Sequence, residues 1–398
     1  MQKNNDVLAK NIACIVIVFL INPMIGILLS VSLAISGEKT KLCLPLIILC
    51  SLYMGAISST KVPSSDVVAY LDAFNNVPVL GLEGSMRIWV DSGEIHEPCY
   101  TLLYYFLYYV LFGKQFLFLN TVTFLSYILT FLAAYRLSKE YKTPNYILVA
   151  SVLTLAFFTQ YFTITGHLIR QMLATSLFFF VLTYKNHNNW IYAIGCFISF
   201  NIHNSLILLI LLSLIPQLNR IMNYKAIVIA FVGTIAFAAL FSTIAETLLG
   251  SMGAGGDVTS TLGRAVEMEG KSEGDANMVL AVLVSAPIIV VGILLSVLNR
   301  EYTKPIVINL GIVWCFIVLM LTNAPFLQSR FFFVIYYFIV FELFYLFTPD
   351  TRWSKAYCFI IPIFMIIRFY MTLNTGAFEF CSSQEALILP YPMLLNFN

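Results

Sequence analysis

Long apolar runs separated by short polar segments restrict the fold of this chain more than any other feature. The runs cover residues 12–35, 42–58, 116–135, 145–163, 167–184, 226–249, 278–298, 305–322, 330–347 and 356–373. A helix needs roughly 20 apolar residues to cross a bilayer, with about 17 as a practical minimum. Of the 398 residues, 60% are hydrophobic and 11% charged, against roughly 25% charged in a soluble domain. We therefore predict an all-α polytopic membrane protein, with residues 1–398 as a single integral membrane domain.

The apolar stretch 190–217 does not fit a single crossing. Its centre is interrupted by Asn201, His203, Asn204 and Ser205. Buried polar groups without hydrogen bonds are costly, so two short half-spans, 190–201 and 203–217, fit the stretch better than one helix with a polar centre. We expect the chain to enter the membrane and return here, with His203 at the apex.

Lysine and arginine are concentrated in short segments between the apolar runs. These segments, which hold 12 of the 22 basic residues, are 36–41, 136–142, residue 185, 219–225, 299–304 and 351–355. Short loops rich in these residues stay on the cytoplasmic side of a membrane. The longer segments 59–97 and 250–277 are instead rich in Asp and Glu. We predict that they form two outer loops.

This topology determines how the segment 98–112 lies. Segments 36–41 and 136–142 are both expected inside, with the runs 42–58 and 116–135 crossing between them, so 98–112 does not cross as well. Its five tyrosines are typical of a helix in the outer membrane interface. The result is about 12 crossings of roughly bilayer length, with both termini outside. Lys3 and Lys10 are the exception, because they would then lie outside.

Arg170 is the most informative charged residue, because it stands between two apolar runs. A charge near the hydrocarbon costs from ~3 kcal/mol upward and usually faces a water-filled cavity or a charged ligand. Gly166, His167, Arg170 and Gln171 follow at helical spacing at the mouth of a span, so we expect one polar face there and an anion site. The alternative is an arginine that reaches to the headgroups from the span end.

Two further arginines lie in predicted outer positions. Arg330 opens an aromatic run, and Arg264 lies in the segment that begins GSMGAGGD. Guanidinium groups pair with phosphate oxygens in a bidentate manner. Convergence of Arg170, Arg264 and Arg330 would suit a diphosphate, whereas the alternative for Arg264 is a solvated loop residue.

Three outer residues are candidates for a general base. Asp66 and Tyr70 lie four residues apart, on one face of a helix. Glu97 directly precedes Pro98, which favours a helix start there; its alternative role is as a first-turn acid that suits the helix dipole. His203 is a candidate because a histidine side chain changes charge near neutral pH when nothing perturbs it, although it could also bond only to the unwound backbone. We rank them His203, Glu97, Asp66.

At these residues the chain resembles the Wzy-type polysaccharide polymerases, in particular their EpsG-like branch. The similarity covers roughly residues 40–345, and Lys61 and Val62 replace the arginine that family members often carry before the aspartate. The matching residues, in chain order, are Asp66 and Tyr70, Glu97 and Pro98, Ile169, Arg170, Gln171 and Ala174, His203 and Ser205, and Arg330 and Tyr336.

The resemblance implies a glycosyltransferase at the outer face of the bacterial inner membrane. It would join undecaprenyl-diphosphate-linked oligosaccharides, which serve as both donor and acceptor, into O-antigen, capsule or exopolysaccharide. Its partners would be membrane lipid and a chain-length regulator. Arginines would supply the positive charge for the lipid diphosphate, and no cofactor or metal is expected.

Other function classes fit the sequence less well. The net charge of +2 leaves no footprint for nucleic acid. A flippase or transporter of lipid-linked oligosaccharides would need a cationic cavity open to both faces. A membrane O-acyltransferase would need a His–Asp pair in a tunnel open to the cytoplasm. The clustering of polar residues on the predicted outer face disfavours both.

Overall fold

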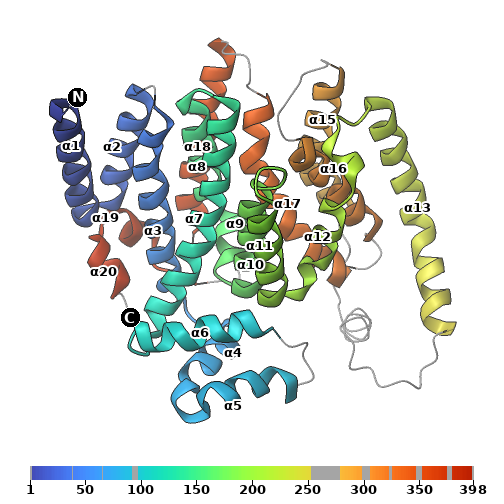
Figure 1. Cartoon of the computed structure of the whole chain (residues 1–398), viewed down its shortest axis with the longest axis horizontal. Coiled ribbons are helices and arrows are strands. Elements are labelled where there is room, and N and C mark those ends of the chain that lie inside the picture. Colours follow the sequence, from blue (N-terminus) through green and yellow to red (C-terminus); the bar gives the residue numbers. More distant parts are fainter. Residues whose placement is uncertain are drawn as a thin grey trace. The chain divides into compact units, whose positions relative to one another are not determined.

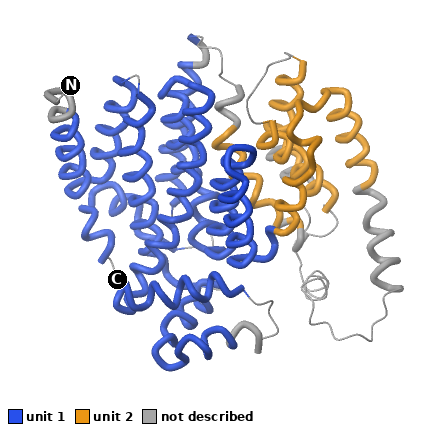
Figure 2. The backbone as a smooth tube through the Cα atoms, in the orientation of Figure 1, with its two compact units in different colours: residues 1–88, 96–206, 347–398 blue, residues 89–95, 207–346 orange. Residues whose placement is uncertain are grey.

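The computed structural model describes most of the chain. The residues that it does not describe are 1, 38, 65, 92–96, 252–277, 298–304, 322–324, 347–351, 374–378 and 397–398. Regular structure in the described part is helical throughout, without a strand. Two compact units are present (Figure 2): unit 1 comprises Met1–Ile88, His96–Leu206 and Phe347–Asn398, and unit 2 comprises Trp89–Ile95 and Ile207–Leu346.

Unit 1 is built around α7 (Gln115–Tyr141), which packs against both α3 (Leu44–Ser59) and α10 (Ile169–Leu182). Gly55 of α3 allows the closest approach, since a Cβ there would lie 2.8 Å from the backbone oxygen of Asn120 on α7. The other helices of the unit are α1 (Gln2–Ile21), α2 (Pro23–Ser36), α4 (Asp66–Asn75), α5 (Val77–Asp91), α6 (Pro98–Val110), α8 (Asn145–Ala156), α9 (Thr159–Thr165), α11 (Asn189–Ile202), α18 (Arg352–Thr372), α19 (Ser383–Ile388) and α20 (Tyr391–Leu395).

Unit 2 contains the apolar helices of the later part of the chain. They are α12 (Ile207–Ser213), α13 (Tyr224–Ser251), α15 (Met278–Val297), α16 (Pro305–Met320) and α17 (Pro325–Leu346). Helix α16 packs against α13, α15 and α17, so it forms the centre of this unit. Its Trp314 is 1% exposed and donates to the carbonyl of Phe331 on α17 at 2.8 Å.

The prediction of an all-helical, apolar chain is confirmed. Among the described residues, three helical stretches are long and apolar enough to cross a membrane, namely Thr40–Ser59, Gln115–Tyr141 and Lys355–Thr372. The pair α8 and α9, bent by 60°, forms a fourth if it is one broken span. The remaining apolar helices are shorter, so the number of about 12 crossings stays a prediction.

The N-terminal run 12–35 is not the single helix that its composition predicts. Helix α1 ends at Ile21, and Asn22 is extended, with its side chain accepting from the Ile25 N–H at 3.1 Å. Pro23 then opens α2, which packs back against α1 (Figure 1). Gly26 permits this contact, because a Cβ there would lie 2.5 Å from the Cα of Phe19.

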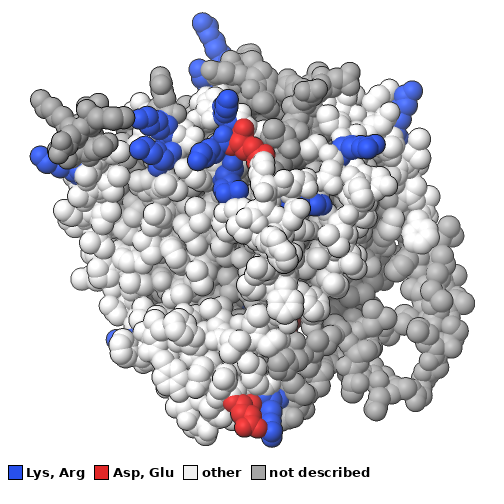
Figure 3. All heavy atoms as spheres, viewed as in Figure 1, with Lys and Arg blue, Asp and Glu red and all other residues white. Residues whose placement is uncertain are grey.

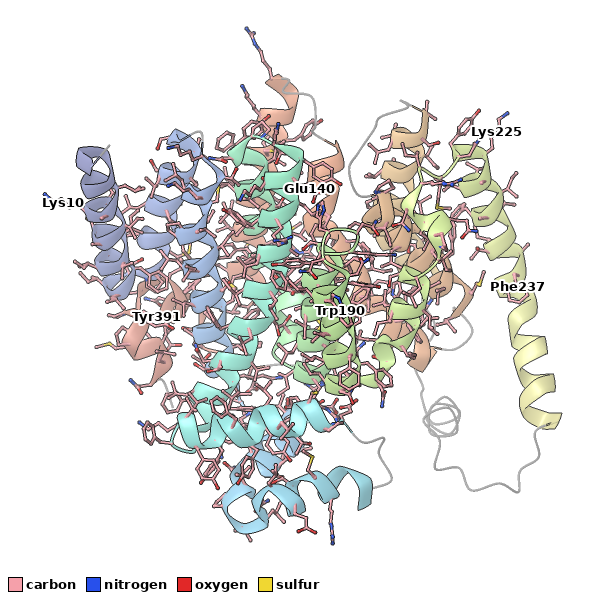
Figure 4. The ribbon with its side chains drawn as sticks, viewed as in Figure 1. Lys10, Glu140, Trp190, Lys225, Phe237 and Tyr391 are labelled. Carbon is pink, nitrogen blue, oxygen red and sulfur yellow. The ribbon has the colours of Figure 1, made fainter. Side chains whose placement is uncertain are left out.

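This helical hairpin changes the expected position of the N-terminus. Lys10 lies toward the same end of unit 1 as Glu140 near the end of α7, whereas Tyr391 lies toward the other end of α1 (Figure 4). On the face drawn in Figure 3, the visible lysines and arginines of unit 1 gather mostly at this first end. Lys10 is therefore no exception to the charge pattern, and the expectation that it lies opposite the basic segments is wrong.

Two other features of the predicted layout are present. Helix α6 begins at Pro98 and lies across the end of α3 and α7, together with α4 and α5 from the segment 59–97 (Figure 1). The stretch 190–217 is broken at His203, where α11 has ended at Ile202 and a short 3₁₀ turn, Asn204–Leu206, follows. The depth of α6 in a bilayer stays a prediction.

Candidate functional site

Arg170 is placed by a sharp change of chain direction before α10. Helices α8 and α9 meet at 60°, and Gly166 and His167 form a turn before α10 begins at Ile169. The expectation that Gly166, His167, Arg170 and Gln171 share one helix is therefore wrong for the first two, which lie in the turn. Arg170 and Gln171 belong to α10. Ile169 is fully buried and fixes the first turn of α10, so the Arg170 side chain leaves from a rigid position.

Glu97 is placed by the start of α6. Pro98 occupies the first helical position, where its missing N–H costs nothing, and Glu97 is the N-cap residue. Its side chain makes no capping hydrogen bond to α6 and is 4% exposed. The carboxylate instead points to partners on other helices, so Glu97 is not simply a first-turn acid.

A carboxylate bridge joins three of the predicted site residues. One oxygen of Glu97, Oε2, accepts from a guanidinium nitrogen of Arg170 at 2.9 Å. The other, Oε1, lies 2.6 Å from Nδ1 of His203 and accepts from the Asn204 N–H at 3.2 Å. An ionised carboxylate only accepts hydrogen bonds, so Nδ1 of His203 donates to it, and in the neutral imidazole the lone pair is then on Nε2.

The electrostatics keep this carboxylate ionised. Burial acts to raise the pKa of Glu97. The hydrogen bond from His203, the charge of Arg170 and the Asn204 N–H outweigh burial, so the pKa of Glu97 lies below its usual range. A carboxylate with a lowered pKa is a weak base. It is better suited to orient His203 and Arg170 than to remove a proton itself.

Two tyrosines enclose the Arg170 guanidinium. Its carbon lies 5.0 Å from the ring centre of Tyr70 on α4 and 5.9 Å from that of Tyr100 on α6. The two rings meet edge to face, with centres 6.0 Å apart. A cation within about 6 Å of an aromatic face is attracted by it, so the tyrosines further fix the guanidinium. Tyr100 was not singled out from the sequence, because it is one of five tyrosines in α6.

Lys61 is a second cation that sequence reasoning treated only as a departure from the family pattern. It is 1% exposed, and its Nζ donates to the Gly166 carbonyl at 3.1 Å. Asp66, the first residue of α4, is close enough to Lys61 to raise its pKa, although burial lowers it more. In the sequence, the signal for a functional role of Lys61 is its position just after the apolar run 42–58.

The remaining predicted residues divide between the two units. Gln171 is 5% exposed beside Arg170. Arg330 belongs to α17 in unit 2, with its side chain outside the described part, and Arg264 lies outside the described residues. Convergence of the three arginines therefore stays a prediction. In the described part of the chain, no group of three His, Cys, Asp or Glu residues is arranged to hold a metal ion.

The surface of unit 1 supports a membrane location. Large apolar side chains are exposed on several helices, among them Ile17 on α1, Phe197 on α11 and Phe364 on α18. Extensive exposed apolar surface is typical of contact with lipid or a partner. The fold and site together define an all-helical protein of the membrane type with a largely buried Arg–Glu–His cluster.

Comparison with known families gives a more specific result. Residues 42–393 match the EpsG family, and the chain belongs to this family, which is polymerase-like and of the Wzy type. This confirms the resemblance found from the sequence motifs. Neither the curated proteins nor the solved structures include a significant match.

Proposed function

We propose that this protein is a polymerase that joins polyprenyl-diphosphate-linked oligosaccharides, in keeping with the EpsG family. The observation that carries the proposal is the contact of 2.6 Å between Glu97 Oε1 and His203 Nδ1, next to the Glu97–Arg170 ion pair. A carboxylate that holds one nitrogen of an imidazole leaves the other ring nitrogen to act as a general base. A neighbouring guanidinium stabilises an anionic leaving group.

The proposed reaction transfers the growing glycan from its lipid carrier. Nε2 of His203 takes the proton from a hydroxyl group of the acceptor sugar, and that oxygen attacks the anomeric carbon of the donor. The bond between this carbon and the diphosphate oxygen breaks, and the polyprenyl diphosphate leaves with the electron pair. Arg170 stabilises the negative charge on the leaving group, with Arg264 and Arg330 as further proposed cations.

Glu97 acts as a positioning residue in this scheme. It holds the imidazole in one tautomer, and it holds Arg170 through its second oxygen. Tyr70 and Tyr100 restrict the guanidinium from two other sides. The donor and acceptor are both lipid-linked, so the reaction belongs at a membrane surface, and we propose the outer face of the bacterial inner membrane. A chain-length regulator is a proposed protein partner.

An O-acyltransferase is the second candidate, because a His–carboxylate pair also activates a sugar hydroxyl for acyl transfer. In the polymerase reaction Arg170 stabilises the negative charge on a diphosphate leaving group. Acyl transfer has no diphosphate leaving group, so the presence of Arg170 favours the polymerase. The test is a deletion strain. We expect loss of the polymer ladder with single repeat units retained. A normal ladder that has lost only its acyl groups would support the acyltransferase instead.

The proposed topology has its own test by cysteine labelling in a background with Cys14 and Cys99 replaced by serine. Glu83→Cys on α5 is expected to react with an impermeant thiol reagent in intact cells. Lys139→Cys and Lys10→Cys are expected to react only after the cells are opened, because the α1–α2 hairpin puts Lys10 at the basic end of unit 1. All three native side chains are exposed. Labelling of Lys10→Cys together with Glu83→Cys in intact cells would contradict this arrangement.

A further inference from the structure

The lysine that follows α3 occupies a position where a charge is costly. Lys61 comes two residues after α3 ends at Ser59 and is among the largest fully buried side chains of the described structure. A buried ammonium group needs hydrogen bonds and charges around it. The Gly166 carbonyl, 3.1 Å from Nζ, and His167 Nδ1, at 3.3 Å, provide part of that surrounding.

The turn that Lys61 contacts leads directly to Arg170. Gly166, His167 and Leu168 separate α9, which ends at Thr165, from α10, in which Arg170 is the second residue. The turn also packs closely against α3, since a Cβ on Gly166 would lie 3.1 Å from Ser58 Oγ. Because so few residues separate the turn from Arg170, a displacement of the turn is passed on to the guanidinium.

The backbone around Lys61 is itself held in place by the C-terminal strap, residues 379–381. The Val62 N–H donates to the Glu379 carbonyl at 3.0 Å, and the Cys381 N–H donates to Thr60 Oγ1 at 2.9 Å. The ring of Phe380 in the strap packs against Phe162 of α9, with centres 4.9 Å apart. Lys61 is thus a fixed point from which its ammonium group reaches the turn.

We propose that Lys61 is a positioning residue whose ammonium group fixes the Gly166–His167 turn and so sets where α10 presents Arg170 to a diphosphate. The role rests on the proposed function, because it concerns the same guanidinium. This role differs from a direct contact with substrate, because Lys61 is buried and its ammonium group contacts the Gly166–His167 turn.

The main test is a double-mutant cycle with purified protein and lipid-linked repeat units. Lys61→Met keeps the length of the side chain and removes the charge, and Lys114→Met, at an exposed lysine before α7, is the matched control. We expect Lys61→Met to lower kcat/KM by about 10- to 100-fold, the size of loss that misplacement by ~1 Å causes. Lys114→Met is expected to leave it unchanged.

The cycle then distinguishes positioning from a general effect on the fold. In an Arg170→Lys background, Lys61→Met is expected to cost much less than in the wild type, because effects that act through one group are not additive. Losses that multiply in full would overturn the proposal, since Lys61 would then act independently of Arg170. Lys61→Arg, which keeps a charge able to reach the Gly166 carbonyl, is expected to recover part of the activity.

A pH profile provides a second measurement. Burial lowers the pKa of Lys61 to about 8, against the opposing effect of Asp66. The titratable groups that act on or contact it are Asp66 on α4 and His167 in the turn. The strap also carries Glu379 and Cys381, and burial raises the pKa of the Cys381 thiol to about 11. Activity is therefore expected to fall as the pH rises through about 8. Lys61→Arg, which stays charged, is expected to lack this fall, and the same fall in both proteins would contradict the proposal.

Binding separates a failure of this inference from a failure of the proposed function. A ligand that binds the folded protein raises its melting temperature, and the probe is a polyprenyl diphosphate in detergent. We expect a rise in the wild type and in Lys114→Met, and a smaller rise in Lys61→Met. A wild type that binds the probe and makes no polymer would refute only the polymerase. Equal shifts and equal rates in Lys61→Met and the wild type would refute only the positioning role. No shift in the wild type would refute both.

Discussion

Replacement of Arg170 by alanine is expected to abolish polymer formation, with a loss of at least about 100-fold in turnover. The guanidinium forms an ion pair with Glu97, and it is already enclosed by Tyr70 and Tyr100. A diphosphate with fewer cations around it is a poorer leaving group. The measurement is in vitro polymerisation with purified lipid-linked repeat units.

The ion pair with Glu97 makes the choice of controls important. Removal of one partner of a buried pair costs about 3–5 kcal/mol of stability, because it leaves the other charge unpaired. Arg170→Lys keeps a positive charge without the bidentate fork, so we expect partial activity and a normal amount of protein. The double replacement Arg170→Met with Glu97→Gln removes both charges and is expected to fold but not to polymerise.

A matched arginine lies elsewhere in unit 1. Arg136 also stacks on a tyrosine, with its guanidinium carbon 3.5 Å from the Tyr184 ring centre, and it donates to Thr183 at 2.9 Å. We expect Arg136→Ala to leave polymerisation close to normal. Full activity in Arg170→Ala, or an equal loss in Arg136→Ala, would refute a specific role for Arg170.

Local sequence signals predicted the starts and ends of several elements. Pro98 predicted where α6 begins, and the polar residues around His203 predicted the break after α11, because both depend on backbone preferences of a few residues. Asn22–Pro23 carried a similar signal, a capping residue followed by proline, which the length of the surrounding apolar run concealed. That dipeptide indicates a helix boundary at this position, whereas the hairpin itself depends on the packing of α2 against α1.

The partners within the site depend on contacts that no local pattern encodes. Glu97 meets Arg170 and His203, which lie 73 and 106 residues further along the chain. The sequence identified Arg170 and His203 from their polar character in apolar surroundings, and Glu97 from its place before the helix start at Pro98. It could not indicate that one carboxylate bridges the other two, and so it ranked Glu97 as a base. Lys61 was missed for the same reason, because its partner Gly166 is 105 residues away.

The second large effect concerns the base. His203→Gln is expected to lower turnover by about 10²- to 10⁴-fold, the contribution of a well-placed general base. Glu97→Gln is expected to cause a loss of similar order, because an amide NH₂ facing Nδ1 would favour the tautomer with its proton on Nε2. Substrate should still bind to both variants, since each keeps the size of its side chain. The measurement combines polymerisation rates with binding of the lipid-linked repeat.

The pattern of losses distinguishes a base from its positioning residue. If Glu97 acts only through His203, the double variant is expected to be no slower than His203→Gln alone, because residues that work as one unit are not additive. Asp66→Asn, one helical turn before Tyr70 on α4, serves as the comparison carboxylate and is expected to keep most of the activity. An active His203→Gln beside an inactive Glu97→Gln would make Glu97 the base. Near-normal rates in all three single variants would mean that none of these side chains removes the proton, and that Arg170 and substrate positioning carry the reaction.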